Sequence, residues 1–325
     1  MMMRSQVNSQ IRKVARSYGL EITKLTPCAS FYKSNSAYKA DTKQGTFLIK
    51  PFIGSEVKLR RITAYMKRLE NEQYPYMPSW RTNLAGTMWI RKNNKLYYVT
   101  DWIDGQQLGE AEQDYMRVGK ALATLHAKSI RIRNWKPRNV LAEVNQLRVQ
   151  NHKFLRRLPF LQNNRTEQGK WFKLVGSHCK LMAEEACQIL DQPSTARKLK
   201  LARLALVHND VTIPNIINSV NQLYLIDWEC SYVGSIYYEI VRALANTTLF
   251  NTGKINAFLT EYTKFRPLDK QEKMIISALF RLPREVWYLG LHSNRGSKST
   301  LFQIVRDTWS KRMEAIHWVD EWAKA

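Results

Sequence analysis

The sequence lacks the long apolar runs and internal repeats that mark several classes of protein. No segment approaches the eighteen or more apolar residues that a membrane-spanning helix requires. Residues 1–20 are basic, but they contain no apolar segment and no cleavage site of small residues, so no secretory signal is predicted. We therefore expect a cytoplasmic protein without a membrane span.

Cysteine is scarce and is not arranged in pairs. The four cysteines are widely scattered, with no CxxC motif, which argues against a zinc site or a disulfide framework. Because an isolated cysteine behaves as a small core hydrophobe, we expect reduced and mostly buried thiols. Hydrophobic residues (44%) and aromatic residues (11%) occur at the levels of a globular protein, which argues against a disordered or fibrous chain.

Acidic residues are few relative to basic ones. The chain has 27 Asp and Glu residues against 51 Lys and Arg residues, which gives a net charge of +24. Such an excess indicates a polyanionic neighbour or tolerance of self-repulsion. The basic residues are spread along the chain, so a solvated basic surface and a nucleic-acid-binding face both remain open. Only the net charge supports a nucleic-acid-binding face, which is the weaker of the two interpretations.

The length of 325 residues allows one large two-lobed unit or two small domains. Residues 1–103 contain short alternating or apolar segments bounded by turn residues, a pattern typical of an antiparallel meander. A helix is expected at about 55–70, with Ser55 as its N-cap and apolar residues at three- and four-residue spacing. The segments expected to form strands are SAYKADT, GTFLIKPF, TMWIRK and KLYYVTDWI.

After residue 104 the pattern becomes mainly helical, with LYLID at 223–227 as the single clear strand. We therefore predict an α+β fold with a small antiparallel β-rich lobe, residues 1–103, and a larger helical lobe, residues 104–325. The helices expected in the second lobe cover about 111–128, 168–191, 236–248, 253–265, 269–281 and 300–322.

The segment VHNDVTIPNII carries the clearest chemical motif, because His208, Asp210 and Asn215 have the spacing H-x-D-x4-N. Asp227 then follows at the end of the apolar strand LYLID. Phosphoryl transfer needs oxygen ligands for a metal ion and a carboxylate that orients the accepting hydroxyl. Mg2+ prefers carboxylate and amide oxygens, so Asn215 and Asp227 suit the metal and leave Asp210 as the base.

His208 is a poor ligand for such a hard ion, and we expect it to hydrogen-bond the loop backbone and hold the loop in shape. A simpler interpretation of Asp210 and Asn215 is a capped turn with local side-chain to backbone bonds. A turn alone, however, does not require a downstream strand that ends in aspartate.

HNDVTIPN followed by LIDWE resembles the aminoglycoside phosphotransferase and choline kinase superfamily. The resemblance implies a bilobal, protein-kinase-like fold that binds ATP and Mg2+, and it covers most of the chain. GTFLIK places Lys50 where the family has its phosphate-binding lysine, and VGKALATLHAK is similar to the family's next helix. YYVTDWIDG is similar to the strand that contacts the nucleotide base, which implies roles for Thr100, Asp101, Trp102 and Ile103.

Within the superfamily, LFRLPREVWYLGL at 279–291, with RPLDKQEK before it, most resembles the kinase-like spore-coat proteins of the CotS group. Packing in a hydrophobic core would equally account for the apolar residues of this segment.

The phosphate-covering loop departs from the family pattern. SFYKSNSAY contains no glycine, so its backbone amides approach phosphates less freely than those of a glycine-rich loop. Polar residues of the loop could still donate hydrogen bonds to a nucleotide, namely Ser30, Ser34, Asn35 and Ser36.

Two further departures concern acidic residues. In active kinases the phosphate-binding lysine is paired with a glutamate of the following helix. Here Glu56, in the first turn of the helix, is the easiest partner for Lys50, although it could instead interact only with the positive end of the helix dipole. Glu70 is a less suitable partner, because it lies at the far end of the helix. After the metal motif, where the family has an aspartate, the chain has Glu239, which we expect to cap a helix or form a salt bridge.

The leading hypothesis is an ATP- and Mg2+-dependent phosphotransferase that acts on a hydroxyl of a small molecule. A neutral or anionic acceptor is favoured, because a chain at +24 repels cations over the roughly 10 Å that salt screening allows, unless the helical lobe holds a local acidic pocket. The alternative is a catalytically weak or inactive structural protein of the spore coat, with spore-coat proteins or another polyanionic surface as partners. A nucleic-acid binder rests on charge alone and would need a contiguous basic face with exposed aromatic residues.

Overall fold

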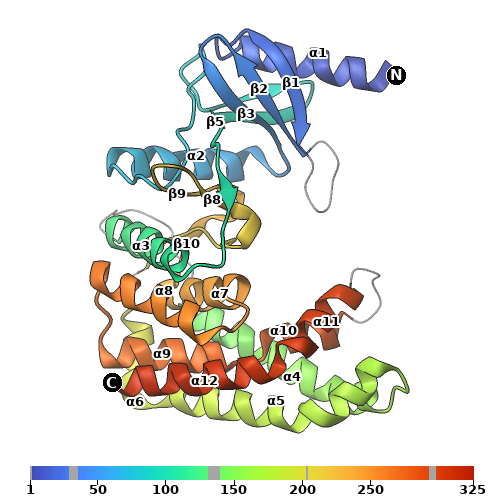
Figure 1. Ribbon diagram of the computed structural model, residues 1–325, viewed down its shortest axis with the longest axis vertical. Helices are drawn as coiled ribbons and strands as arrows, with labels where there is room; N and C mark the ends of the chain where they lie inside the picture. Colours follow the sequence, from blue (N-terminus) through green and yellow to red (C-terminus); the bar gives the residue numbers. More distant parts are fainter. Residues whose placement is uncertain (1, 29–35, 131–139, 203, 293–297) are drawn as a thin grey trace. The chain divides into compact units, whose positions relative to one another are not determined.

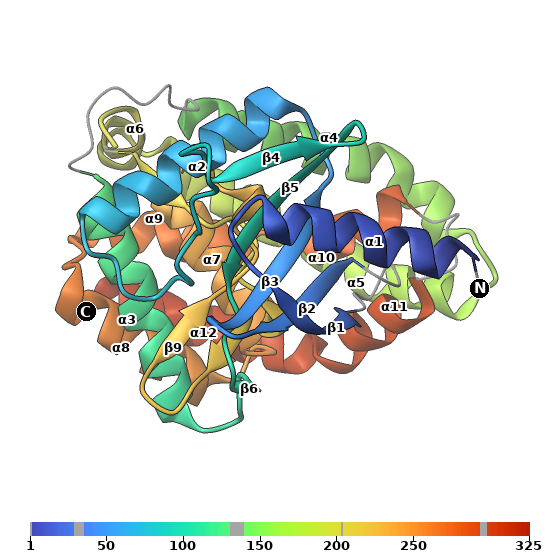
Figure 2. The ribbon, with the colours of Figure 1, turned by 90° about the horizontal axis from the view of Figure 1, so that it is seen from above.

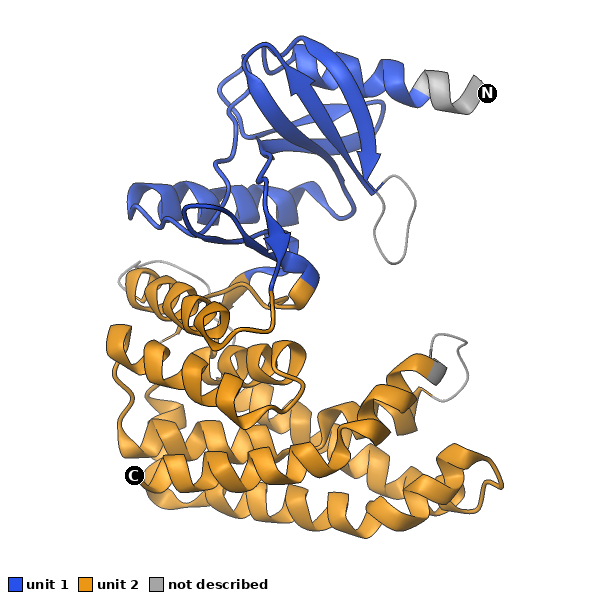
Figure 3. Ribbon diagram, in the orientation of Figure 1, with its two compact units in different colours: residues 1–108, 214–231 blue, residues 109–213, 232–325 orange. Residues whose placement is uncertain are grey.

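The computed structural model describes residues 2–28, 36–130, 140–202, 204–292 and 298–325. They separate into two compact units (Figure 3): unit 1 comprises Met1–Leu108 and Pro214–Ser231, and unit 2 comprises Gly109–Ile213 and Tyr232–Ala325. The assignment of nucleotide binding to residues 1–103 and of catalysis to residues 104–325 stays a prediction.

Unit 1 contains a five-stranded antiparallel sheet with the strand order β1-β2-β3-β5-β4. The four strands expected from the sequence are present. β1 was not expected, because its mostly exposed residues lack the alternating apolar pattern of a half-buried strand. Asn93 and Asn94 both have positive φ angles (48° and 57°), which suits the tight turn between β4 and β5. The strands are β1 Ile22–Cys28, β2 Ala37–Thr42, β3 Gly45–Phe52, β4 Trp89–Lys92 and β5 Lys95–Asp101.

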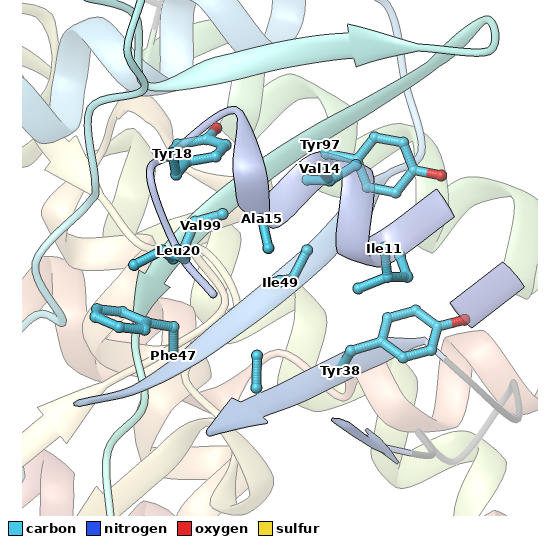
Figure 4. Packing of buried hydrophobic residues seen from close by; sticks show 11 residues of the cluster. Ile11, Val14, Ala15, Tyr18, Leu20, Tyr38, Phe47, Ile49, Tyr97 and Val99 are labelled. Atoms are coloured by element: carbon cyan, nitrogen blue, oxygen red, sulfur yellow. The ribbon is translucent and has the colours of Figure 1, made fainter. Parts of the chain in front are cut away.

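Helix α1, Met2–Arg16, lies across one face of this sheet (Figures 1 and 2). Its residues Ile11, Val14 and Ala15 are buried and point at the sheet, where they belong to the same hydrophobic cluster as Ile49 and Val99 (Figure 4). The sequence interpretation did not include this helix. The three- and four-residue spacing of its buried residues is the signal that could have predicted it.

Helix α2, Glu56–Asn71, begins as expected, because the Ser55 side chain accepts a hydrogen bond from the Lys58 backbone N–H at 3.2 Å. It contacts the 3-10 turn η2, Trp228–Cys230, of the same unit. The segment expected as a strand at 223–227 forms β9, Leu223–Leu225. It belongs to a three-stranded sheet with β6, Gln106–Gln107, and β8, Ile216–Asn218.

Unit 2 is mainly helical and also contains a β7–β10 ladder, Ala205–Val207 paired with Tyr232–Gly234. The expectation of one clear strand after residue 104 is therefore wrong. The segment expected as one helix at 300–322 is divided at Thr308, and α4, α6 and α10 were not expected. The helices are α3 Glu112–Ser129, α4 Val140–Gln162, α5 Glu167–Asp191, α6 Pro193–Lys200, α7 Ile236–Thr247, α8 Thr252–Phe265, α9 Lys270–Arg281, α10 Arg284–Leu291, α11 Lys298–Asp307 and α12 Trp309–Lys324.

Close packing of α3 against α8 requires a glycine at position 119. A Cβ atom there would lie 2.3 Å from the carbonyl oxygen of Phe258, so any larger residue would push the two helices apart. Among the described residues, no helix combines the length and the apolar character needed to cross a membrane.

The four cysteines are free thiols, as the sequence predicted. The expectation that they are mostly buried is wrong, because only Cys179 is fully buried. Cys28 and Cys187 are half-buried, and Cys230 is exposed.

Candidate functional site

A short hairpin in unit 1 holds the two residues expected to bind metal at one end of its ladder. Ile216 pairs with Leu225 across β8 and β9, and the Ile226 N–H donates a hydrogen bond to the Asn215 carbonyl at 2.9 Å. Asn215 and Asp227 therefore flank the same end of the hairpin. The turn is anchored by Trp228, a buried residue whose indole N–H donates to the Leu225 carbonyl at 2.8 Å.

Asp227 adopts a left-handed backbone conformation, with φ 64° and ψ 61°. This conformation turns the chain from β9 into η2 and directs the residues that follow. Most residues with a Cβ atom avoid it, whereas Asp and Asn adopt it at lower cost because their short polar side chains can hydrogen-bond locally. Left-handed residues of this kind recur at functional sites, where the surrounding structure maintains the strain.

Lys50 forms an ion pair with two carboxylates that follow this hairpin. Its ammonium nitrogen lies 2.7 Å from Asp227 Oδ1 and 3.1 Å from Glu229 Oε1. Lys50 stands opposite Tyr98 in the β3–β5 ladder, and the Tyr98 hydroxyl donates to Glu229 Oε1 at 2.9 Å. Tyr98 thus hydrogen-bonds Glu229, while Lys50, its neighbour across the ladder, bonds both Asp227 and Glu229.

The charges in this cluster shift its pKa values. Burial lowers the pKa of Lys50, but the carboxylates of Asp227 and Glu229 more than reverse this, so the pKa lies above its ordinary value. Burial, together with the negative charge of Glu229, raises the pKa of Tyr98 well above that of a free phenol. Lys50 therefore stays protonated and Tyr98 stays a hydrogen-bond donor at neutral pH.

The partner expected for Lys50 in the following helix is wrong. Glu56 instead accepts hydrogen bonds from Arg60 at 2.8 Å and from Arg91 at 2.6 Å. Glu70 bonds Lys67 at 3.1 Å within its own helix. Glu229, only two residues after Asp227, takes the place that the sequence interpretation gave to a helix glutamate.

The oxygen groups of this cluster suit a magnesium ion. The Asp227 side chain is 35% exposed, and Asn215 contributes an amide at the same end of the hairpin. Among the described residues there is no group of three or more His, Cys, Asp or Glu side chains that could hold a metal by themselves. Mg2+ fits such a sparse set, because it binds through one or two carboxylates and completes its shell with phosphates and water.

The four residues expected to contact the nucleotide base lie at the end of β5 and just beyond it. Thr100 is buried, and Asp101 forms an ion pair with Arg81 at 2.7 Å. The Trp102 indole N–H donates to Asp104 at 2.8 Å, and Ile103 is half-buried. The carboxylate of Asp101 and the indole of Trp102 are thus already engaged. Ser30, Ser34 and Asn35 lie outside the described residues.

The remaining two residues of the motif lie in unit 2, in the loop that follows β7. His208 is fully buried, and its Nδ1 accepts a hydrogen bond from the Asp210 backbone N–H at 3.3 Å. This is a contact with the loop backbone, of the kind expected for His208. Between them, Asn209 adopts a left-handed conformation with φ 63°, so a sharp turn presents Asp210.

A chain of buried hydrogen bonds holds the Asp210 loop in place. The Asn209 backbone N–H donates to Glu239 Oε1 at 2.6 Å, and Glu239 Oε2 lies 2.7 Å from His126 Nε2. His126 Nδ1 lies 2.7 Å from the Tyr262 hydroxyl. Burial lowers the pKa of His126, against the opposing effect of Glu239. The ring is therefore neutral, donates from Nε2 to Glu239 and accepts from Tyr262.

The sequence interpretation missed three site residues: Glu239, Glu229 and Tyr98. Glu239 was expected to cap a helix or form a salt bridge, but it bonds the backbone of the Asp210 loop directly. The glutamate in LIDWE, two positions after Asp227, was a visible signal for Glu229. Nothing local in the sequence distinguishes Tyr98 from other strand tyrosines, because its role depends on β3–β5 register.

A model of the Phosphotransferase enzyme family matches residues 32–268. The chain belongs to this family. The match includes Lys50, the Asp210 loop and the hairpin that ends in Asp227. The first part of the predicted resemblance, to phosphotransferases of this kind, is thus confirmed.

Solved structures share the fold of this chain. An aminoglycoside phosphotransferase from Alicyclobacillus acidocaldarius has a TM-score of 0.82 at 14% identity, over 95% of each chain. An amicoumacin kinase, solved with AMP-PNP and Ca2+, has a TM-score of 0.60 at 14% identity, over 96% of each chain. The predicted kinase-like α+β fold, with an antiparallel sheet and a mainly helical second part, is confirmed.

A curated relative, the Protein LicA homolog of Metamycoplasma hominis, is 23% identical over 173 residues. The alignment covers 52% of this chain and spans 58% of the length of the relative.

Proposed function

We propose that this phosphotransferase uses ATP and Mg2+ to phosphorylate a hydroxyl group of a neutral or anionic small molecule. The observation that carries the proposal is the cluster in which Lys50 bonds Asp227 at 2.7 Å while Asn215 flanks the same hairpin end. A cation for phosphates and oxygen ligands for a metal are the groups that phosphoryl transfer requires. The nucleotide analogue and Ca2+ in the amicoumacin kinase structure support the same cofactor class.

Each residue has a role suited to its chemistry. Lys50 would bind nucleotide phosphates, and Asn215 and Asp227 would hold Mg2+, which when bound offsets the negative charge of the phosphates. Asp210 would orient the acceptor hydroxyl and receive its proton. The acceptor oxygen forms a bond to the γ-phosphorus as the bond from that phosphorus to ADP breaks.

Residues at two places would bind the rest of the nucleotide. Thr100, Asp101, Trp102 and Ile103 would border the base, and Ser34 and Asn35 would donate hydrogen bonds to phosphates. His208 would act on the loop through its hydrogen bond to the Asp210 backbone, and not on substrate.

The alternative, a catalytically weak or inactive spore-coat protein of the CotS group, rests on the resemblance at residues 279–291. Five apolar side chains of that segment are at most 3% exposed, namely Leu279, Phe280, Leu282, Trp287 and Leu289. Core packing alone accounts for them. Because Asp210, Asn215 and Asp227 are all retained, we favour the enzyme.

Thermal unfolding with millimolar ATP tests the proposal. ATP with Mg2+ is expected to raise the melting temperature of the parent protein more than ATP with EDTA. Asp227→Asn keeps a residue suited to the left-handed backbone. This variant is expected to lose the part of the rise in melting temperature that depends on Mg2+. Release of ADP with a panel of hydroxyl compounds then identifies the acceptor. The absence of any shift with ATP and Mg2+ would refute the proposal.

A further inference from the structure

One face of α7 runs along the Asp210 loop. Arg242 Nη1 donates a hydrogen bond to Asn209 Oδ1 at 2.5 Å, and Asn246 Nδ2 donates to the Val211 carbonyl at 3.4 Å. Asn209 and Val211 are the residues on either side of Asp210. The four-residue spacing of Arg242 and Asn246 places them on one face of the helix. This face therefore contacts the loop that carries Asp210.

A second arginine reaches the same face from α10 of unit 2. The guanidinium carbon of Arg284 lies 5.3 Å from the ring centroid of Tyr238, and that of Arg242 lies 5.8 Å from the same ring. Tyr238 precedes Arg242 by one helical turn. Both distances are within the range of cation–π contacts, so both guanidinium groups contact the same aromatic ring.

The two guanidinium groups are not paired by a salt bridge within the described part of unit 2, although the charge of Arg284 acts on Glu285. Neither Arg242 nor Arg284 forms a salt bridge with a described carboxylate, and Arg284 Nε is buried without a hydrogen-bond partner there. The adjacent Glu285 is bonded to Arg312 at 2.6 Å. Although burial alone would raise the pKa of Glu285, the charges of Arg312 and Arg284 hold it below its ordinary value.

The other nearby carboxylate, Glu239, is also occupied. It is 3% exposed and bonds His126 and the Asn209 backbone, and it forms no salt bridge with Arg242 or Arg284. Two guanidinium groups that form no salt bridge with a described carboxylate, and of which one contacts the Asp210 loop, favour the binding of anions. Guanidinium groups are planar donors that match the geometry of carboxylates and phosphates.

We infer that Arg242, Arg284 and Tyr238 form an acceptor subsite that binds an anionic group, a phosphate or a carboxylate, of the hydroxyl compound that is phosphorylated. The inference rests on the proposed function and narrows its acceptor to anionic compounds. The arginines bind the anionic group of the acceptor while its hydroxyl faces Asp210. A cationic acceptor is repelled by the same pair.

Binding measured by calorimetry without nucleotide tests the subsite independently of phosphoryl transfer. The probes are sn-glycerol 3-phosphate, glycerate and uncharged glycerol, with inorganic phosphate as a fourth ligand. We expect the two anionic hydroxyl compounds to bind the parent protein and glycerol not to bind. Comparison of the phosphate ester, the carboxylate and inorganic phosphate identifies which anionic group the subsite prefers.

The decisive variant is Arg242→Gln with Arg284→Gln, compared with Arg165→Gln, which removes an exposed charge between α4 and α5. The double variant is expected to bind the anions about tenfold or more weakly, and Arg165→Gln to bind them as the parent does. A version with lysine at both positions, which keeps the charge, is expected to retain part of the binding. Circular dichroism spectra confirm that each variant is folded.

Three results would overturn the inference: equal binding of anions and glycerol, full binding by the double glutamine variant, or equal loss in Arg165→Gln. The last would mean generic attraction to a basic chain. If anions bind as expected but ATP and Mg2+ produce no thermal shift, the subsite stands and the phosphotransferase proposal fails. The two proposals are therefore distinguished.

Discussion

The ammonium group of Lys50 lies 2.7 Å from Asp227 Oδ1, although the two residues are 177 positions apart in the chain. Strand β3 supplies the lysine, and a turn after β9 supplies the aspartate. Glu229 bonds the same ammonium group, so a single cation offsets two carboxylates. Nucleotide phosphates and a metal ion would compete for these same groups.

The Lys50–Asp227 pair is expected to stabilise unit 1. Lys50→Met leaves two carboxylates without their cation and should lower the free energy of unfolding by about 1.5–3 kcal/mol. Combined with Asp227→Asn, the loss should be smaller than the sum of the two single losses, because the residues are in contact. Urea unfolding of the parent protein, the two single variants and the double variant measures the coupling energy between Lys50 and Asp227.

Lys39→Gln is the matched control for this cycle. Lys39 pairs with Asp104 at 3.5 Å, and the aspartate side chain is 82% exposed. Solvent screens such a pair, so its removal should cost about 0.5 kcal/mol or less. Strictly additive losses for Lys50→Met and Asp227→Asn would contradict the predicted coupling.

Glu229, and not Glu56, is expected to affect nucleotide binding. Glu229→Gln removes a carboxylate that holds Lys50, so it should alter the thermal shift produced by ATP and Mg2+. Glu56→Gln removes only ion pairs with Arg60 and Arg91 and should leave that shift unchanged. Thermal unfolding with and without nucleotide measures both effects. An unchanged shift in Glu229→Gln, or a lost shift in Glu56→Gln, would contradict the assignment.

The left-handed backbone of Asp227 gives a separate prediction. Asp227→Gly and Asp227→Asn should both tolerate φ 64°, whereas Asp227→Ala should be less stable than either by about 1 kcal/mol. All three should lose the metal-dependent thermal shift, because each removes the carboxylate. Chemical unfolding separates the backbone effect from the loss of the ligand. Equal stability of the alanine and glycine variants would argue against strain at this position.

His126 is expected to make stability depend on pH. Its folded-state pKa is lowered by burial, so the unfolded chain binds its proton at a higher pH than the folded chain. Stability from the neutral ring is thus fully present above about pH 6.5 and decreases as the pH falls from there towards the folded-state pKa. His126→Gln, which does not titrate, should show a shallower decrease between about pH 6.5 and pH 5.

Urea unfolding at several pH values measures this slope. His152→Gln is the matched control, because His152 is exposed on α4. Its slope should equal that of the parent protein. The same slope in His126→Gln and the parent would show that the buried ring does not contribute to acid sensitivity.

Local sequence patterns were sufficient for much of the fold. The Ser55 cap and the apolar spacing of α2 were readable because helix periodicity and capping act over a few residues. β1 and β7 were not predicted, because edge and very short strands take their stability from partners elsewhere in the chain. The spacing of Ile11, Val14 and Ala15 in α1 was a local signal, but their burial against Ile49 and Val99 depends on the assembled sheet.

The sequence by itself identified His208, Asp210, Asn215 and Asp227 as candidate site residues, because their spacing and the strand before Asp227 are local features. Only the tertiary structure decided which partners these groups take. Glu56 and Glu229 are equivalent carboxylates in sequence, but strand register and the turn at Asp227 bring Glu229 to Lys50. Ion pairing depends on distances of a few ångströms, and long-range folding sets those distances.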